Sequence, residues 1–386
     1  MNRKIPFVLV LAAAAAGLFY LSTSKTPEPT PEISSQNKQI TDLSGETKTF
    51  KTPCEKVILP RSRDIYELSA VLGGQTADKI VAWGEDIKTS DTDAYKKYSE
   101  KFPSLADKPL VGSIYNDSLD PENVLSYNPD LIVMDNFMTR RQYKSVDRLK
   151  EAGMPMAFMD QTNDILTNQQ KGITVLGQLF NKEERAEEIA DFVDGQINIV
   201  TSRLAKIEKT APVVYMETGD LGAKQYGSTW GVDVNGQYTS WGAMIQYAGG
   251  KNIVGDLPGE LFSIDPEYLL KSNPDVIIIT GANWPTVEDS MRMGYYTSGD
   301  EAQQLLKSFT NRPGWQDLEA VKNGRVYAIH HGMTMHIFAF AALQQMAKWF
   351  YPEEFADINP EANLKEFHNR FMPIEYSGTW FTEISK

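Results

Sequence analysis

The chain has 386 residues, which is too long for one ordinary hydrophobic core and predicts two globular units. Its formal net charge of −13 argues against a general nucleic-acid-binding protein, because phosphate contacts require concentrated Lys and Arg. Cys54 is the only cysteine, so neither an intramolecular disulfide nor a metal–cysteine cluster can form.

The N-terminus has the pattern of an export signal. Two basic residues precede an apolar stretch over residues 5–21, and small residues follow it. We interpret residues 1–24 as a signal peptide; because the stretch is also long enough to span a bilayer, an uncleaved membrane anchor is the alternative. Either interpretation predicts a periplasmic or other extracytoplasmic location. Residues 25–38 are rich in Pro, Ser and Glu and predict an extended tether, with the folded part starting near Gln39.

Strand-like and helix-like segments alternate in the first half of the chain. The expected helices cover residues 64–74 and 143–153. The expected strands cover residues 56–59, 79–83, 109–113, 130–135 and 155–160. Such alternation predicts a parallel sheet with helices on both of its faces.

A long helical stretch separates the two halves of the chain. Apolar side chains recur at helical spacing from residue 182 to about residue 207, and a helix of this length would measure about 38 Å. A single helical connection predicts a stiff hinge, so we expect the two halves to move only slightly around a ligand. The predicted boundaries are residues 39–181 for the N-terminal lobe, 182–208 for the linking helix and 209–386 for the C-terminal lobe.

The alternation resumes after the helix. Strand-like and helix-like segments follow at residues 212–217, 241–250, 275–281 and 325–330, and a helix is expected over residues 337–352. The second half therefore predicts another parallel α/β sheet.

The two halves share a duplicated segment. The first copy begins at Ser118 and reads SLDPENVLSYNPDLIV, and the second begins at Ser263 and reads SIDPEYLLKSNPDVII. Each copy predicts an Asp N-cap, a Pro in the first turn of a short helix, a turn at Asn-Pro-Asp and a buried strand. A motif that recurs some 145 residues later indicates two related α/β lobes and not a solenoid.

At this level the sequence resembles a known family, the periplasmic binding proteins for ferric siderophores, haem and cobalamin. The segments that carry the resemblance are the two duplicated units, KVILPRSRDIYELSAVLG, LGQLFNKEERAEEIADF, GGKNIV, NGRVYAIHHG and ALQQMAKWFYPEEF. Together they cover the chain from about Ile40 to Phe381. The resemblance implies two Rossmann-like α/β lobes with parallel sheets, joined by one long helix.

The same resemblance implies a function. We expect the solute-binding protein of an ABC importer, a monomer without a resident cofactor, whose partners are a small-molecule iron complex and an inner-membrane permease. In this family a glutamate at a helix start on each lobe pairs with an arginine of the permease, and Glu122 and Glu267 occupy the matching positions. The alternative is that both glutamates are there because the helix dipole favours an acidic residue in any first turn.

The loops that follow the expected strands hold the candidate ligand contacts, because α/β sheets bind ligands at the carboxyl ends of their strands. A ferric siderophore is a bulky anion with flat or apolar arms, so its site needs fixed positive charge and aromatic walls. The residues selected on this basis are Arg61, Arg63, Asn136, Phe137, Tyr226, Trp230, Trp284, Arg292, Tyr295, His330 and His331. The alternatives are that Arg61 or Arg63 pairs with Asp64 or Glu67 and that the aromatic side chains only pack.

Three of the four histidines fall between residues 330 and 336. We interpret His330 and His331 as hydrogen-bonding residues at the mouth of the site, with axial haem ligation as the competing interpretation. A bare metal site is disfavoured, because no second set of ligands is identifiable in the other lobe.

An exported hydrolase or a metal-assembly enzyme is the alternative from a different functional class. The chain contains no GxSxG, Walker, GxGxxG or HExxH motif, so the sequence favours a binding protein over an enzyme. The predicted ligand is an iron complex, either a ferric siderophore or, alternatively, haem or cobalamin.

Overall fold

The computed structural model describes residues 35–115, 117–233, 235–284 and 286–384, and Ser35–Lys386 form one compact unit. The predicted signal peptide or anchor, residues 1–24, lies outside the described residues. No helix in the described ranges is long and apolar enough to cross a membrane.

An antiparallel hairpin opens the described chain. It consists of β1 (Gln36–Thr41) and β2 (Thr47–Thr52), which pair along their whole length. Ile40 and Phe50 bury one side of the hairpin in the core. Residues 36–38 therefore belong to the folded unit and not to the predicted tether, because the strand pairing extends past the buried residues to Gln36.

The N-terminal lobe contains a four-stranded parallel sheet in the order β4-β3-β5-β6. Its strands are β3 (Val57–Leu59), β4 (Ile80–Trp83), β5 (Leu131–Asp135) and β6 (Met156–Met159). The strand predicted at residues 109–113 is absent, and Leu110 makes only a single parallel bridge to Trp83. The chain turns away at Gly112, whose φ of +95° suits glycine and ends any extended run.

The C-terminal lobe contains a five-stranded sheet in the order β11-β10-β9-β7-β8. Its strands are β7 (Val213–Thr218), β8 (Lys251–Asn252), β9 (Val276–Gly281), β10 (Val326–His330) and β11 (Phe381–Glu383). All neighbouring strands are parallel except β11, which pairs antiparallel with β10 at the edge. The two parallel sheets confirm the α/β class and the two-lobed arrangement.

Helices connect the strands in both lobes. In the first lobe they are α1 (Ile65–Leu72), α2 (Thr76–Lys79), α3 (Asp86–Ser90), α4 (Thr92–Lys101), α5 (Pro121–Ser126), α6 (Asn136–Arg140), α7 (Lys144–Glu151) and α8 (Ile165–Phe180). After the linking helix they are α10 (Ser240–Tyr247), α11 (Pro266–Ser272), α12 (Gly299–Phe309), α13 (Glu319–Lys322), α14 (Ala339–Phe350) and α15 (Pro360–Phe371). The 3₁₀ helices are η1 (Ser62–Asp64), η2 (Gly73–Gln75), η3 (Pro103–Leu105), η4 (Trp315–Asp317) and η5 (His331–Met335).

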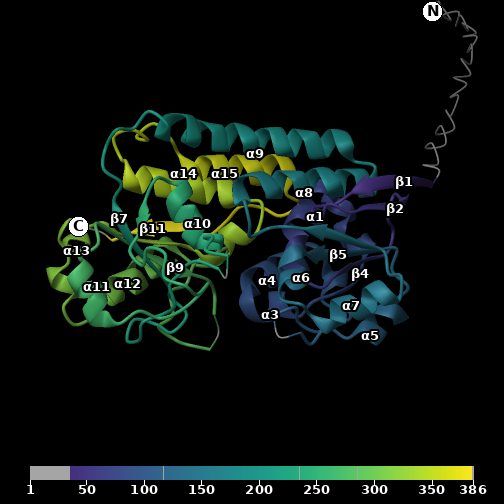
Figure 1. Ribbon diagram of the computed structural model, residues 1–386, viewed down its shortest axis with the longest axis horizontal. Coiled ribbons are helices and arrows are strands. Elements are labelled where there is room, and N and C mark those ends of the chain that lie inside the picture. Colours follow the sequence, from purple (N-terminus) through teal and green to yellow (C-terminus); the bar gives the residue numbers. More distant parts are fainter. Residues whose placement is uncertain (1–34, 116, 234, 285, 385–386) are drawn as a thin grey trace, which may run out of the picture. The chain divides into compact units, whose positions relative to one another are not determined.

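The predicted linking helix is α9 (Glu183–Leu204), a run of 22 residues or about 33 Å. Its buried face carries apolar residues at helical spacing, including Ile189, Val193 and Val200. Figure 1 shows α8, α9, α14 and α15 running along the same side of the two lobes. Helix α9 is therefore part of a packed layer of helices. This packing makes the connection between the lobes stiffer than a free-standing helix would be.

The duplicated segments form the same local structure twice. Asp120 and Asp265 cap α5 and α11 by accepting hydrogen bonds from the backbone N–H groups two residues on. Asn128 and Asn273 follow these helices with positive φ values of 45° and 43°, a conformation that asparagine tolerates and that redirects the chain into β5 and β9. The two copies thus use the same chemistry to start a helix and to end it.

Cys54 lies just before β3 and is fully buried. Burial, aided by Asp130 and Glu55, raises the pKa of its thiol to about 12. The thiol therefore behaves as a small apolar side chain in the N-terminal lobe.

Candidate ligand-binding cleft

A cavity of about 660 Å³ lies where the two lobes face each other. The N-terminal lobe lines it with Arg61, Tyr115, Asp135, Phe137, Arg140, Arg141 and Thr162, and the C-terminal lobe with Trp230, Asp233, Asn235, Thr239, Ser240, Glu260, Leu261 and Met335. A second hollow of about 700 Å³ beside β11 is lined by the C-terminal lobe alone, so it does not lie at the lobe interface. The 660 Å³ cavity is therefore the candidate cleft.

Parallel strands of the first sheet place its residues at the cleft. Arg61 follows the end of β3, Asp135 ends β5, and Phe137 lies in α6 directly after β5. From the other lobe, Trp230 follows β7 and Met335 ends η5 after β10. The cleft thus lies at the carboxyl ends of both sheets, as expected for an α/β protein.

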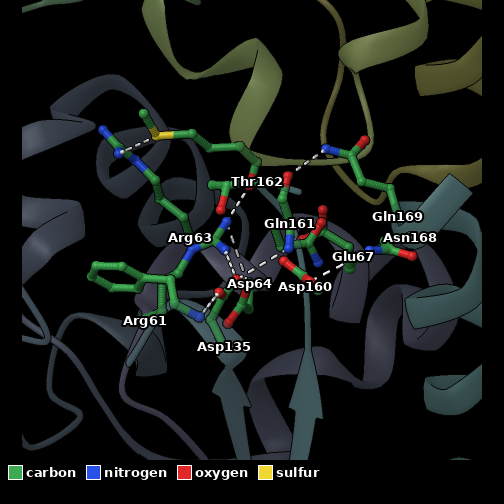
Figure 2. A network of polar contacts seen from close by, with 12 residues as sticks. Arg61, Arg63, Asp64, Glu67, Asp135, Asp160, Gln161, Thr162, Asn168 and Gln169 are labelled. Carbon is green, nitrogen blue, oxygen red and sulfur yellow. Dashed lines mark hydrogen bonds and ion pairs between the residues drawn. The ribbon is translucent and has the colours of Figure 1, made fainter. Parts of the chain in front are cut away.

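Arg61 is a buried cation in the wall of this cavity. Its guanidinium donates to Asp135 Oδ2 at 2.6 Å and to the carbonyl oxygen of Met335, and it lies 3.6 Å from Asp64 Oδ1. Burial opposes its charge, but Asp64 and Asp135 outweigh this effect and raise the pKa of Arg61. Figure 2 shows this network. Arg61 therefore stays charged and also joins the two lobes through Met335.

Arg63 is buried but does not line the cavity. It donates to the carbonyl oxygen of Ser90 at 2.7 Å and to the sulfur of Met335 at 3.3 Å, and it lies 3.7 Å from Asp91. Arg63 is therefore paired within the N-terminal lobe. Its acidic partner is Asp91 and not Asp64 or Glu67, the two partners considered from the sequence.

Two predicted aromatic residues lie in the cavity wall and three lie elsewhere. Phe137 and Trp230 line the cavity. Trp284 packs against His331 with ring centroids 5.3 Å apart. Tyr226 accepts a hydrogen bond from Trp315 at 2.9 Å, and Tyr295 is buried with its hydroxyl 3.1 Å from His368. Tyr226 and Tyr295 therefore serve the packing of the C-terminal lobe.

Asn136 and Arg292, also predicted, likewise lie outside the cavity lining. The Asn136 amide donates to the carbonyl oxygen of Leu43 at 2.8 Å, which ties α6 to the N-terminal hairpin. Arg292 donates to Glu301 Oε1 at 2.6 Å on the start of α12. Both side chains have partners within their own lobe.

None of the histidines is among the residues that line the cavity. His330 accepts a hydrogen bond from the Gly332 N–H, and His331 Nδ1 lies 2.9 Å from the Thr280 hydroxyl. Burial lowers the pKa of both rings to about 3, so they are neutral at physiological pH. Among the described residues, no group of three or more His, Cys, Asp or Glu side chains is arranged to hold a metal ion.

Arg140 and Arg141 also line the cavity, although they were not among the residues predicted from the sequence. Both stand at the end of α6, with side chains 39% and 51% exposed. Arg140 lies 3.6 Å from Asp160, and Arg141 lies 3.1 Å from Glu260 of the other lobe. A helix predicted directly after β5 would have identified them, because both residues lie one helical turn beyond the predicted ligand contact Phe137.

The lobes also contact each other at α4. The hydroxyl of Thr92 donates to the carbonyl oxygen of Asn283 at 2.7 Å, and the Asn283 amide donates to Asp93 at 2.8 Å. Asp93 also accepts from the Tyr296 N–H at 3.0 Å. The lobes are therefore joined at α4 as well as through α9.

Comparison with known proteins shows the family of the chain. The family model for periplasmic binding proteins matches residues 70–331, which is more than half of the sequence. The chain belongs to the periplasmic binding protein family. It is 37% identical to the TroA-like periplasmic binding protein FepB from Veillonella parvula, whose structure superposes with a TM-score of 0.84 and covers 90% of this chain and 99% of that one.

Other relatives carry different names. The molybdate-binding protein MolA of Haemophilus influenzae is 22% identical over 305 residues, which cover 73% of this chain and 77% of MolA. The haem uptake protein IsdE of Staphylococcus aureus is 27% identical over 221 residues, which cover 54% of this chain and 68% of IsdE. The periplasmic binding protein described here is therefore similar to proteins with chemically different cargo.

Membership of the family confirms the broad functional prediction. The protein is an extracytoplasmic solute-binding protein of an ABC importer, and its relatives are substrate-binding proteins and not enzymes. In this periplasmic binding protein the cleft combines guanidinium groups with aromatic rings. The cavity lining contains three arginines and three carboxylates, those of Asp135, Asp233 and Glu260.

Proposed function

We propose that this protein captures an anionic iron complex, of the ferric siderophore class, in the cleft between its lobes and delivers it to a membrane permease. The observation that carries the proposal is a cavity of about 660 Å³ with three arginines and three aromatic residues, Tyr115, Phe137 and Trp230, in its wall. Its volume lies in the range of about 300–1,000 Å³ that is usual for pockets of drug-sized ligands.

The arginines differ in how readily they could contact such a ligand. Arg140 and Arg141 are partly exposed. Arg141 has an exposed ion pair with Glu260 of the cavity lining, and exposed pairs of this kind contribute little to stability, whereas Arg140 lies 3.6 Å from Asp160, which is mostly buried. A ligand carboxylate or phenolate can replace Glu260 at small cost and receive forked hydrogen bonds from Arg141. Arg61 is held by its buried partners Asp135 and Asp64. It would supply positive charge from the cavity wall without changing its position.

The aromatic residues suit the remaining part of such a ligand. Trp230 comes from one lobe, and Tyr115 and Phe137, with ring centroids 6.0 Å apart, come from the other. Flat or apolar ligand arms would pack between these rings as the complex fills the cleft.

Haem is the second candidate, and one observation favours it. Tyr115 and Met335, two side-chain types that ligate haem iron in other proteins, line the cavity, whereas the histidines do not. The similarity to a haem uptake protein is consistent with this candidate. Axial ligation by His330 or His331, considered from the sequence, finds no support in the lining.

Fluorescence titration tests the proposal. Trp230 is one of seven tryptophans and lines the cavity, so a ligand in the cleft should quench its emission. The panel is a ferric tris-catecholate, ferric citrate, haem, cobalamin and molybdate. Tightest binding of a ferric complex is expected, with less quenching in Trp230→Phe. Tightest binding of cobalamin or molybdate would overturn the proposed ligand class, and tightest binding of haem would favour the second candidate.

Delivery to the permease is proposed to use Glu122 and Glu267. Both side chains are exposed in the first turns of α5 and α11, and no ion pair of the described residues involves either. Figure 1 shows α5 and α11 on the side of their lobes away from α9. The two carboxylates are thus free to meet basic residues of a permease, as the family resemblance implies.

A further inference from the structure

Two buried carboxylates lie behind Arg61 with incomplete hydrogen bonding. Asp64 is 2% exposed, and neither of its carboxylate oxygens has a hydrogen-bond partner among the described residues. Glu67, one helical turn later, is 1% exposed; its Oε1 accepts from the Ile337 N–H at 2.7 Å, but its Oε2 has no partner in the described structure. A buried ionised carboxylate without donors is costly, so this pair calls for an explanation.

Asp135, on the other side of Arg61, is different. It accepts hydrogen bonds from Arg61 at 2.6 Å, from the Phe137 N–H at 2.9 Å and from the Gln161 N–H at 3.2 Å. Donors of this kind stabilise the charged form of a carboxylate. If one of the two carboxylates beside Arg61 becomes protonated, it is therefore Asp64, which lacks hydrogen-bond donors, and not Asp135 (Figure 2).

The titratable or charged groups that interact with the pair are Arg61 after β3, Asp86 in α3, Tyr98 in α4 and Asp135 at the end of β5. Arg63, Tyr66, Asp91 and His336 lie next to these groups and interact with Arg61, with Asp86 or with one another. Arg61 and Asp135 also line the cavity, and Arg61 is the cation of the two. Arg61 is the group that attracts an anion in the cleft. It therefore connects the pair electrostatically to whatever occupies the cleft.

We propose that capture of an anionic ligand is coupled to the uptake of one proton by the Asp64–Glu67 pair. The inference rests on the proposed function, because it requires a ligand with negative charge near Arg61. Such a ligand adds a third negative group around one guanidinium, and protonating a carboxylate that lacks donors relieves the excess. The proton comes from solvent and adds to a carboxylate oxygen, and no other bond changes.

The pair titrates in the range where binding is measured. Burial raises the pKa of Asp64 to about 7 and the pKa of Glu67 to about 8, although Arg61 opposes both shifts. An anion in the cleft raises them further. The liganded protein then binds more protons than the free protein between about pH 6 and 9, so affinity should fall as pH rises, by up to about tenfold per pH unit.

The first experiment needs no ligand. The folded-state pKa values exceed those of an unfolded chain, so the wild-type free energy of unfolding should fall as pH rises from 7 to 9, above the range in which the histidines of the unfolded chain titrate. Glu67→Gln keeps the acceptor for Ile337 and should flatten this fall, whereas Glu188→Gln, which removes an exposed carboxylate of α9, should not. Identical pH profiles for wild type and Glu67→Gln would overturn the proposal.

The second experiment counts protons during binding. Calorimetric titration with a ferric tris-catecholate at pH 7.5, in two buffers of different ionisation enthalpy, should show up to one proton taken up by wild type and by Glu188→Gln. The Asp64→Asn/Glu67→Gln double variant should take up none. Equal uptake by wild type and the double variant, or none by either, refutes the coupling.

The two experiments fail in different ways. If the ferric complex does not bind wild type, the proposed function loses its ligand class, and molybdate then serves as the anion for the proton count. The unfolding profiles still decide whether the pair titrates in the free protein. The two failures are therefore distinguishable.

Discussion

Replacement of Arg140 and Arg141 by alanine tests whether these two arginines of the cavity lining bind the ligand. Arg141 forms an exposed ion pair with Glu260 at 3.1 Å, so its replacement should cost less than about 1 kcal/mol of folding free energy. Arg140 lies 3.6 Å from Asp160, whose side chain is 10% exposed and also accepts hydrogen bonds from Asn163, so its replacement leaves that carboxylate with other donors. A hydrogen bond to a charged ligand group contributes about 1.5–3 kcal/mol. Each single variant should therefore lose about 10- to 150-fold in affinity, and the double variant on the order of 100-fold or more.

The assay is fluorescence titration with a ferric tris-catecholate, paired with thermal unfolding to show that the variants stay folded. Arg292→Ala is the matched control, because it removes the same side chain from a surface ion pair with Glu301, outside the cavity. Its affinity should equal that of wild type. Wild-type affinity in the Arg140→Ala/Arg141→Ala variant, or an equal loss in Arg292→Ala, would refute the assignment.

Three further predictions concern stability and transport. Arg312→Met leaves the buried Glu217 with its hydrogen bond from Tyr215 but without its cation at 2.6 Å, and it should lower the free energy of unfolding by about 3–5 kcal/mol in urea titrations; a loss under 1 kcal/mol would contradict this. Burial lowers the pKa of all four histidines, so the unfolded chain binds more protons below about pH 6.5 and stability should fall from pH 6.5 to 4. A flat calorimetric profile over that range would exclude this effect. Charge reversal of Glu122 and Glu267 should leave affinity unchanged but abolish ATP-dependent uptake in vesicles that contain the permease, and normal uptake would favour the helix-dipole explanation.

Much of the fold was predictable because its signals are local. The Asp-Pro helix starts and the Asn-Pro-Asp turns depend on neighbouring backbone groups, and both copies fold as the sequence indicated. The apolar period of α9 likewise predicted a long helix with one buried face. The expected strand at residues 109–113 failed because its composition suits a strand, whereas the turn at Gly112 leads the chain away after one bridge.

The binding site was only partly predictable, because ion-pair partners distant in sequence decide which cations face the cleft. Arg61 and Arg63 follow the same strand, yet one reaches the cavity and the other pairs with Asp91. Nothing local in the sequence distinguishes them. Arg141 meets Glu260 only when the two lobes are assembled, so its position at the cleft depends on a contact between residues 119 positions apart.

The buried state of Cys54 has a practical consequence. With a thiol pKa of about 12, the protein should resist thiol-reactive dyes although its native cysteine is retained. Leu261 lies at the cleft and is 53% exposed, so Leu261→Cys would create a single reactive handle there. A polarity-sensitive dye attached at this position would change its emission as cargo enters, which makes the protein a ready scaffold for a reagentless optical sensor.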